Sequence, residues 1–212
     1  GASNAQLSIV GDFDEKEITR VIDHLFGTWK SPKPYQRIPQ EFYDAPVVKR
    51  SFETPDKPNA VFFARQNIKM NDANPDYPAL TLGNFIFGGG FLNSRLATRL
   101  RQKEGFSYSV ASGFSASSLD ETGSFTAQAI YAPENGEKLE KAFYEEIKKV
   151  LTEGFTESEL KEAKQGWLLG RQRNRGNDAA LRSSMVNYLF LDRTFAWDDE
   201  MEKKVQALTL EQ

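Results

Sequence analysis

The residues best suited to chemistry lie between Asn84 and Ser112: Arg101, Tyr108 and three consecutive glycines, Gly88, Gly89 and Gly90. Arg101 belongs to an arginine-rich helix predicted over 94–104, and Tyr108 to a strand that returns along this helix. A guanidinium and a phenol could therefore converge in space, and both groups donate hydrogen bonds. Spacing alone nevertheless favours a structural interpretation, with Arg101 a solvated helix residue and Tyr108 a half-buried strand residue.

The glycine run separates an apolar helix end from the arginine-rich helix. Three consecutive glycines cost backbone entropy, so the fold must need a positive φ or a close backbone approach there. The run lacks the pattern G-x-x-x-x-G-K-[ST], and no strand precedes it, which argues strongly against a nucleotide-binding loop. Two interpretations stay open: a tight turn between helices, or a flexible loop that faces a substrate.

The elements that must position these residues are predicted from periodicity and capping signals. Alternating and apolar runs predict strands over 6–13, 47–53, 59–66, 106–117 and 123–131. Helix start signals and apolar stripes predict helices that begin at Asp14, Asn74, Ser94, Asn135 and Thr156, and over 178–191 and 198–207. Because hairpins dominate and helices cluster, we expect an α+β fold with a mostly antiparallel sheet covered by helices on one face.

The N-terminal third contains an amphipathic helix followed by a proline-rich stretch. Its apolar stripe consists of Ile18, Val21, Ile22, Leu25, Phe26 and Trp29. His24, the single histidine, lies off this stripe and is interpreted as a flank or surface residue. Residues 30–46 contain four prolines without periodicity, which predicts an extended linker and the best domain boundary in the chain.

Composition narrows the class of protein. The chain has 212 residues, of which 39% are hydrophobic and 27% charged, as in a soluble globular protein. The net charge of -3, with both signs interspersed, argues against a nucleic-acid partner. No apolar run is long enough to predict a membrane span. With one histidine and no cysteine, the chain cannot supply the three ligands of a usual catalytic zinc site, so no metal or cofactor is expected here.

The stretch from the glycines to Tyr108 also resembles a known family. The glycine run is followed by Ser94-Arg95-Leu96, and Leu100 to Tyr108 match L-R-x-K-x-G-x-x-Y. This pattern resembles the second, non-zinc-binding half of pitrilysin/insulinase-type zinc metallopeptidases, and with its flanks the resemblance covers nearly the whole chain. It implies that residues 1–29 are the trailing strand and helix of a preceding half, 30–46 the linker and 47–212 the second half.

The resemblance also implies a function. The catalytic half of the family carries H-x-x-E-H, which this chain lacks. The chain would then be the non-catalytic half of a peptide-hydrolysing enzyme, inactive alone, with zinc and general base on another half, either in the same parent chain or in a partner subunit. Arg101 and Tyr108 would stabilise charge that builds on the peptide oxygen, and Gly88, Gly89 and Gly90 would contact the peptide. We expect a bacterial source, with the compartment, cytoplasm or periplasm, left open.

Two alternatives to a peptidase half remain. The chain could be a proteolytically inactive structural homologue, like the core proteins of respiratory complexes, or a module that binds peptides at a strand edge. We further expect residues 6–29 to fill an open sheet edge, either within the chain or in a second copy by a strand swap.

Overall fold

The computed structural model describes residues 3–212, apart from the side chain of Phe91. It contains, in chain order, α1 (Glu15–Phe26), β1 (Ala60–Ile68), α2 (Tyr77–Asn84), η1 (Phe85–Gly89), η2 (Phe91–Asn93), η3 (Ala97–Lys103), β2 (Ser107–Ala116), β3 (Gly123–Tyr131), η4 (Pro133–Asn135), α3 (Gly136–Glu153), α4 (Glu157–Arg175), α5 (Asp178–Phe190) and α6 (Ala196–Ala207). The chain divides into two compact units, residues 1–39 with 169–200, and residues 40–168 with 201–212.

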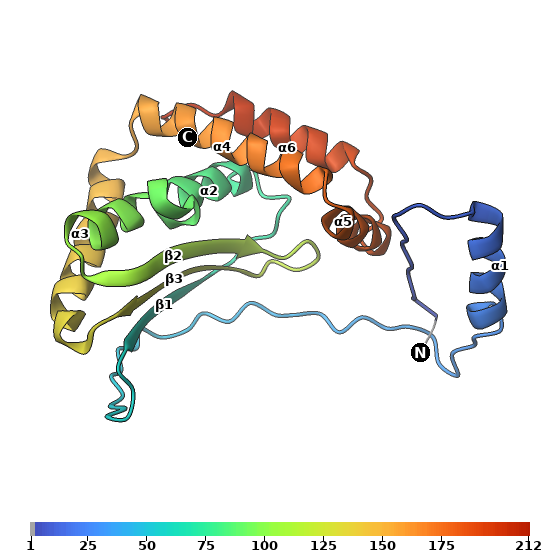
Figure 1. Ribbon diagram of the computed structural model, residues 1–212, viewed down its shortest axis with the longest axis horizontal. Helices are drawn as coiled ribbons and strands as arrows, with labels where there is room; N and C mark the ends of the chain where they lie inside the picture. The colour runs from blue at the N-terminus through green and yellow to red at the C-terminus, as the bar shows by residue number, and fades with distance from the viewer. Residues whose placement is uncertain (1–2) are drawn as a thin grey trace. The chain divides into compact units, whose positions relative to one another are not determined.

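The larger unit, residues 40–168 with 201–212, is built on a three-stranded antiparallel sheet in the order β1-β3-β2. The register pairs Ala64 with Ala127 across β1 and β3, and Ser112 with Ala127 across β2 and β3. Helix α2 lies over one face of this sheet (Figure 1). The prediction of an α+β fold with an antiparallel sheet and helices on one face is confirmed.

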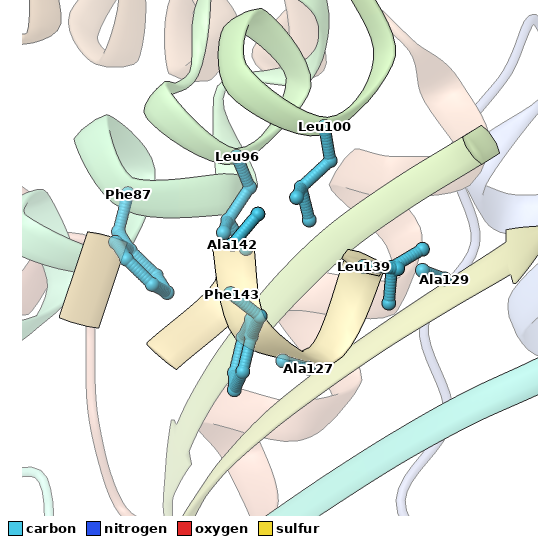
Figure 2. Packing of buried hydrophobic residues seen from close by; sticks show 8 residues of the cluster. All are labelled: Phe87, Leu96, Leu100, Ala127, Ala129, Leu139, Ala142 and Phe143. Atoms are coloured by element: carbon cyan, nitrogen blue, oxygen red, sulfur yellow. The ribbon is translucent and has the colours of Figure 1, made fainter. Parts of the chain in front are cut away.

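A single hydrophobic core lies between the sheet and its helices. Its buried members are Phe87, Leu96, Leu100, Ala127, Ala129, Leu139, Ala142 and Phe143. Figure 2 shows these side chains, contributed by η1, the helix that begins at Ser94, β3 and α3. Strand β3 contributes to this core because its side chains alternate between the two faces of the sheet. Ala127 and Ala129 share the face that meets the helices.

The opposite face of the sheet exposes apolar side chains. Val61 and Phe63 of β1 are 66% and 61% exposed, and Ile130 of β3 is 42% exposed. Their neighbours in sequence, Phe62 and Ala64, pack against the core instead. Side chains along these strands therefore alternate between the core face of the sheet and an exposed face that is also apolar.

Two predicted strands do not form. Residues 6–13 and 47–53 contain neither helix nor strand. Both predictions are wrong for the same physical reason: an apolar run adopts strand structure only where a neighbouring strand satisfies its backbone hydrogen bonds. It follows that residues 6–13 do not complete the sheet within the chain, whereas a swap into a second copy stays a prediction.

The helix start signals are largely confirmed. Asp14 Oδ1 accepts a hydrogen bond from the Glu17 amide at 2.8 Å and caps α1. Thr156 and Glu159 form a reciprocal capping box at α4, with bonds of 2.8 and 3.2 Å. Asn135 precedes α3 without capping it through its side chain. None of the helices over residues 3–212 has the length and apolar character that a membrane span requires.

Candidate functional site

The glycine run lies at the end of α2, where the helix widens into the π-helical turn η1. The Gly90 amide donates to the Phe85 carbonyl oxygen at 2.7 Å, a bond that spans five residues instead of four. Gly88 is buried, and a Cβ there would lie 2.7 Å from the backbone nitrogen of Ser112. A close approach of η1 to β2 therefore explains Gly88, as the entropy argument required.

The other two glycines are less enclosed. Gly89 is exposed, and a Cβ on it would meet the Asn84 side chain at 2.8 Å. A Cβ on Gly90 would meet the Phe85 carbonyl oxygen at 2.6 Å. Gly90 thus leaves no room for a Cβ in the tight turn, whereas the flexible Asn84 side chain can move away from one at Gly89. Of the three glycines, Gly89 is the one exposed to solvent.

The helix after the glycines is anchored by its leucines and by Arg95. Leu96 and Leu100 are fully buried in the core. Arg95 forms a bidentate ion pair with Glu159, with bonds of 2.5 and 2.7 Å, and lies 5.0 Å from the ring centre of Phe155. The hydrogen bonds from Arg95 lower the pKa of Glu159 to about 2. Arg95 therefore has a structural role.

The other two arginines of this helix differ in their partners. Arg99 donates to Glu145 at 2.9 Å and lies 3.3 Å from a carboxylate oxygen of Glu104. Arg101, in the last turn of η3, is exposed and has no hydrogen-bond or ion-pair partner among the described residues. The helix thus holds two guanidinium groups against carboxylates and leaves the third available to a ligand.

Tyr108 is turned outward by an irregularity in β2. Ser107 pairs with Tyr131 and Ser109 with Ile130, so Tyr108 is an extra residue in the strand, a β-bulge. Strict alternation from Val110, which packs against the core, would place Tyr108 on the core face. Instead Ser107 is buried and the Tyr108 side chain is 62% exposed. The bulge therefore presents a phenol hydroxyl to solvent.

A short turn connects the two candidate residues. Gly105 adopts a φ of +65°, which ends η3, and the Phe106 amide donates to the Leu100 carbonyl oxygen at 2.8 Å. Arg101 and Tyr108 thus flank one glycine-terminated turn, and both side chains are solvent-accessible. Two exposed hydrogen-bond donors on such a turn are suited to an anionic or strongly polarised oxygen.

The donor set of the chain does not fit a catalytic zinc ion. His24 is exposed on α1. Within residues 3–212, no three histidine, aspartate or glutamate side chains are grouped to hold a metal. A zinc site of the H-x-x-E-H kind cannot be assembled from these residues.

One charged cluster was not foreseen from the sequence. Asp198 lies in the first turn of α6, within the helix predicted over 198–207, but it is buried and accepts hydrogen bonds from Arg171 and from the Tyr188 hydroxyl. Burial, together with the bond to Asp198, raises the pKa of Tyr188. Within the smaller unit, the cluster joins the end of α4, α5 and the start of α6. Only the long-range contact distinguishes Asp198 from an ordinary helix-start residue.

Comparison with known proteins identifies a family to which the chain is similar. A family model described as the peptidase M16 inactive domain matches residues 1–166. The chain is 25% identical over 216 aligned positions to the "Non-peptidase homolog YmxG" of Helicobacter pylori, covering 92% of this chain and 48% of that protein. It is 30% identical to an "Uncharacterized zinc protease" of Rickettsia felis, covering 77% of this chain and 38% of the relative.

The fold is shared with a solved structure. The crystal structure of a peptidase M16 inactive domain from Pseudomonas fluorescens is similar with a TM-score of 0.61 and 27% identity, over 72% of this chain and 35% of that one. The chain spans less than half of the length of each of these two curated relatives.

Proposed function

The chain belongs to the peptidase M16 inactive-domain family, and we propose that it is the non-catalytic half of a zinc metalloendopeptidase. In this proposal it forms one wall of a chamber that holds an extended peptide. The zinc ion, the general base and the attacking water come from a partner half that carries H-x-x-E-H. The bacterial origin of the relatives supports the expectation of a bacterial source.

The observation that carries the proposal is the β-bulge at Tyr108. Bulges are over-represented beside active sites, where they re-aim a side chain. Here the bulge exposes a tyrosine that strand alternation would have buried. Exposing a large aromatic ring gains no packing energy, so a ligand contact accounts for the feature better than stability does.

The role of the two residues follows from the chemistry of peptide hydrolysis. Negative charge builds on the carbonyl oxygen when water attacks the peptide bond. The Tyr108 hydroxyl and the Arg101 guanidinium would donate hydrogen bonds to this oxygen or to the neighbouring peptide. That Arg101 lacks a carboxylate partner in the described chain, unlike Arg95 and Arg99, supports this assignment.

The glycine run has a smaller part in the proposal. Gly89 would contribute its exposed backbone to the peptide, with Gly90 setting the turn, while burial against β2 already accounts for Gly88. Backbone groups without a Cβ allow close approach of an extended peptide.

The proposal is tested by reconstitution. The 212-residue chain would be mixed with the zinc-bearing half encoded in the same genome, recognised by H-x-x-E-H, and cleavage of a quenched fluorescent peptide would be followed. Loss of one donor to a developing oxyanion costs about 10²–10³ in rate, so Tyr108→Phe and Arg101→Ala should each lower kcat by about that factor. Matched controls are Tyr144→Phe, at a tyrosine that is 55% exposed on α3, and Arg50→Ala, at an exposed arginine.

Unchanged cleavage by Tyr108→Phe would overturn the assigned role. Equal losses in Tyr108→Phe and Tyr144→Phe would do the same, because they would point to a general effect on folding or assembly.

A second candidate function is that of a structural homologue without proteolysis. The relative from Helicobacter pylori is named a non-peptidase homolog, which favours this candidate. It predicts a stable complex with the partner half and no cleavage of any peptide in a diverse library. A third possibility, peptide capture, would use β1 or β2, which are the two edges of the sheet in the described chain.

A further inference from the structure

The larger unit contains a cavity of about 320 Å³ beside the arginine-rich helix. Arg95, Thr98, Arg99 and Lys103, which recur at helical spacing, form one wall of this cavity. Asn93 of η2, together with residues of α3 and of the first turn of α4, forms the rest. All of these residues lie within 40–168, so the cavity belongs to one compact unit. A polar space of this volume has room for a small polyatomic ion with some of its water.

The carboxylates on the wall of this cavity already have donors. Glu159 accepts both hydrogen bonds of the Arg95 pair and a further one from the Thr156 amide. Glu146 is buried, and one of its oxygens lies 3.3 Å from the ammonium nitrogen of Lys149. A cationic ligand would have to displace one of these donors, so the cavity is poorly suited to a cation.

The groups on the wall that lack partners can all donate hydrogen bonds. The side chains of Asn93, Thr98 and Lys103 make no hydrogen bond or ion pair within residues 3–212. Arg99 Nε is buried and has no hydrogen-bond acceptor, because its approach to Glu104 at 3.3 Å lacks hydrogen-bond geometry. A buried polar atom without a partner is rare in a native fold and indicates a bound group or ion. What the cavity lacks is therefore an acceptor.

The backbone that carries these donors has an unusual form. Thr98, Arg99 and Lys103 belong to the π-helix η3, in which the Glu104 amide donates to the Arg99 carbonyl oxygen across five residues, at 3.2 Å. Such widened turns are rare and are frequent at functional sites. Since η3 also carries Arg101, a ligand in the cavity would stabilise the helix from which Arg101 projects.

We propose that this cavity binds a small oxyanion of the phosphate class. Lys103 supplies the charge, because it is the cation on the wall that no carboxylate of the described chain contacts. Thr98, Asn93 and Arg99 donate the further hydrogen bonds. A tetrahedral oxyanion presents acceptors in several directions, as donors from both η3 and η2 require. The site needs neither zinc nor a peptide, so it is independent of the proposed function.

Titration of the 212-residue chain with inorganic phosphate at constant ionic strength tests the proposal. In NMR spectra, the amides of Asn93, Thr98 and Lys103 should shift and reach saturation. Lys103→Met should raise the Kd by about tenfold or more, since a charged hydrogen bond is lost. Lys141→Met is the matched control, because it removes the same charge from an exposed lysine of α3 outside the cavity. It should change the Kd less than about twofold.

Equal weakening by the two substitutions would overturn the proposal, because it would show a diffuse attraction between phosphate and the positive charges of the chain. Acetate should bind at least about tenfold more weakly than phosphate, since a carboxylate has only two oxygens to accept from the donors. Equal affinity for acetate would contradict the assignment to the phosphate class.

Thermal unfolding supplies a second measurement. Phosphate at about ten times its Kd should raise the Tm of the wild type by about 3–6 °C. Phosphate also stabilises proteins in general, because it is excluded from their surfaces. The increase should therefore be compared in Lys103→Met, which should keep the Tm of the free chain because Lys103 is exposed. An increase of the same size in this variant would count against a specific site.

Discussion

Helices α1 and α3 have the same kind of sequence and opposite environments. Both begin next to an Asn or Asp and carry apolar residues at helical spacing. In α3 the stripe is buried, with Leu139 fully enclosed and Phe143 only 2% exposed, whereas no residue of α1 is buried. Periodicity thus identifies the face of a helix that needs a partner, but the partner itself is a property of the rest of the fold.

Phe143→Ala should have the largest effect on stability, a loss of about 3–5 kcal/mol in the free energy of unfolding. The centroid of the Phe143 ring lies 4.9 Å from that of Phe62 and 6.3 Å from that of Phe87. Removal of the ring therefore leaves a cavity. Leu25→Ala in α1 should cost less than about 0.5 kcal/mol. Urea unfolding followed by circular dichroism measures both. Similar losses would mean that the α1 stripe is packed in solution, and the contrast between the helices would disappear.

Gly88→Ala should cost about 1–3 kcal/mol, because the new Cβ would overlap the β2 backbone. Its distances would be 2.7 Å to the nitrogen and 2.8 Å to the Cβ of Ser112, and a strand backbone in a sheet cannot move away easily. Gly170→Ala in α4 is the control, since nothing lies within 4 Å of its Cβ position. There alanine should raise stability by about 0.5–1 kcal/mol. A neutral Gly88→Ala would show that η1 shifts freely, contrary to a turn fixed by packing.

Local signals in the sequence were sufficient for much of the larger unit. The Thr156–Glu159 capping box and the alternation of β3 involve residues close in sequence, and both were predicted correctly. The strands predicted over 6–13 and 47–53 do not form, because a strand needs a neighbouring strand to pair with. No local sequence pattern shows whether such a neighbour exists.

The residues of the candidate site were proposed from the sequence, but their geometry could not be predicted from it. Period-two alternation cannot reveal the bulge that turns Tyr108 outward, because the extra residue is defined by pairing with β3. Likewise Arg95, Arg99 and Arg101 look equivalent on one helix. Contacts with Glu159 and Glu145, which are distant in sequence, help to distinguish the two held arginines from the exposed one.

The Arg95–Glu159 pair predicts a pH-dependent contribution to stability. The pKa of Glu159 in the folded chain is about 2, below its ordinary value of 4.5. The contribution is therefore complete above about pH 4.5 and is lost as the pH falls toward 2. Glu159→Gln should cost about 1–2 kcal/mol at pH 7, since the pair is only partly buried. The difference from the wild type in urea unfolding should shrink between pH 4.5 and 2.

The control for this pair is Glu157→Gln, at an exposed carboxylate in the same turn of α4. It should cost only a few tenths of a kcal/mol through the helix dipole. A Glu159→Gln difference that stays constant down to pH 2 would show that the ion pair does not stabilise the folded chain.

The smallest expected effects compare the caps of two helices. Thr156→Ala should lower the free energy of unfolding by about 1 kcal/mol, because the start of α4 is held to the core region by the neighbouring Phe155 and by the Arg95–Glu159 pair. Asp14→Ala removes an equivalent bond, that to the Glu17 amide, from α1. It should leave the urea midpoint unchanged and accelerate amide exchange only in the first turn of α1, by about fivefold. Equal effects of the two caps on global unfolding would show that α1 unfolds together with the core, and the contrast between α1 and α3 would disappear.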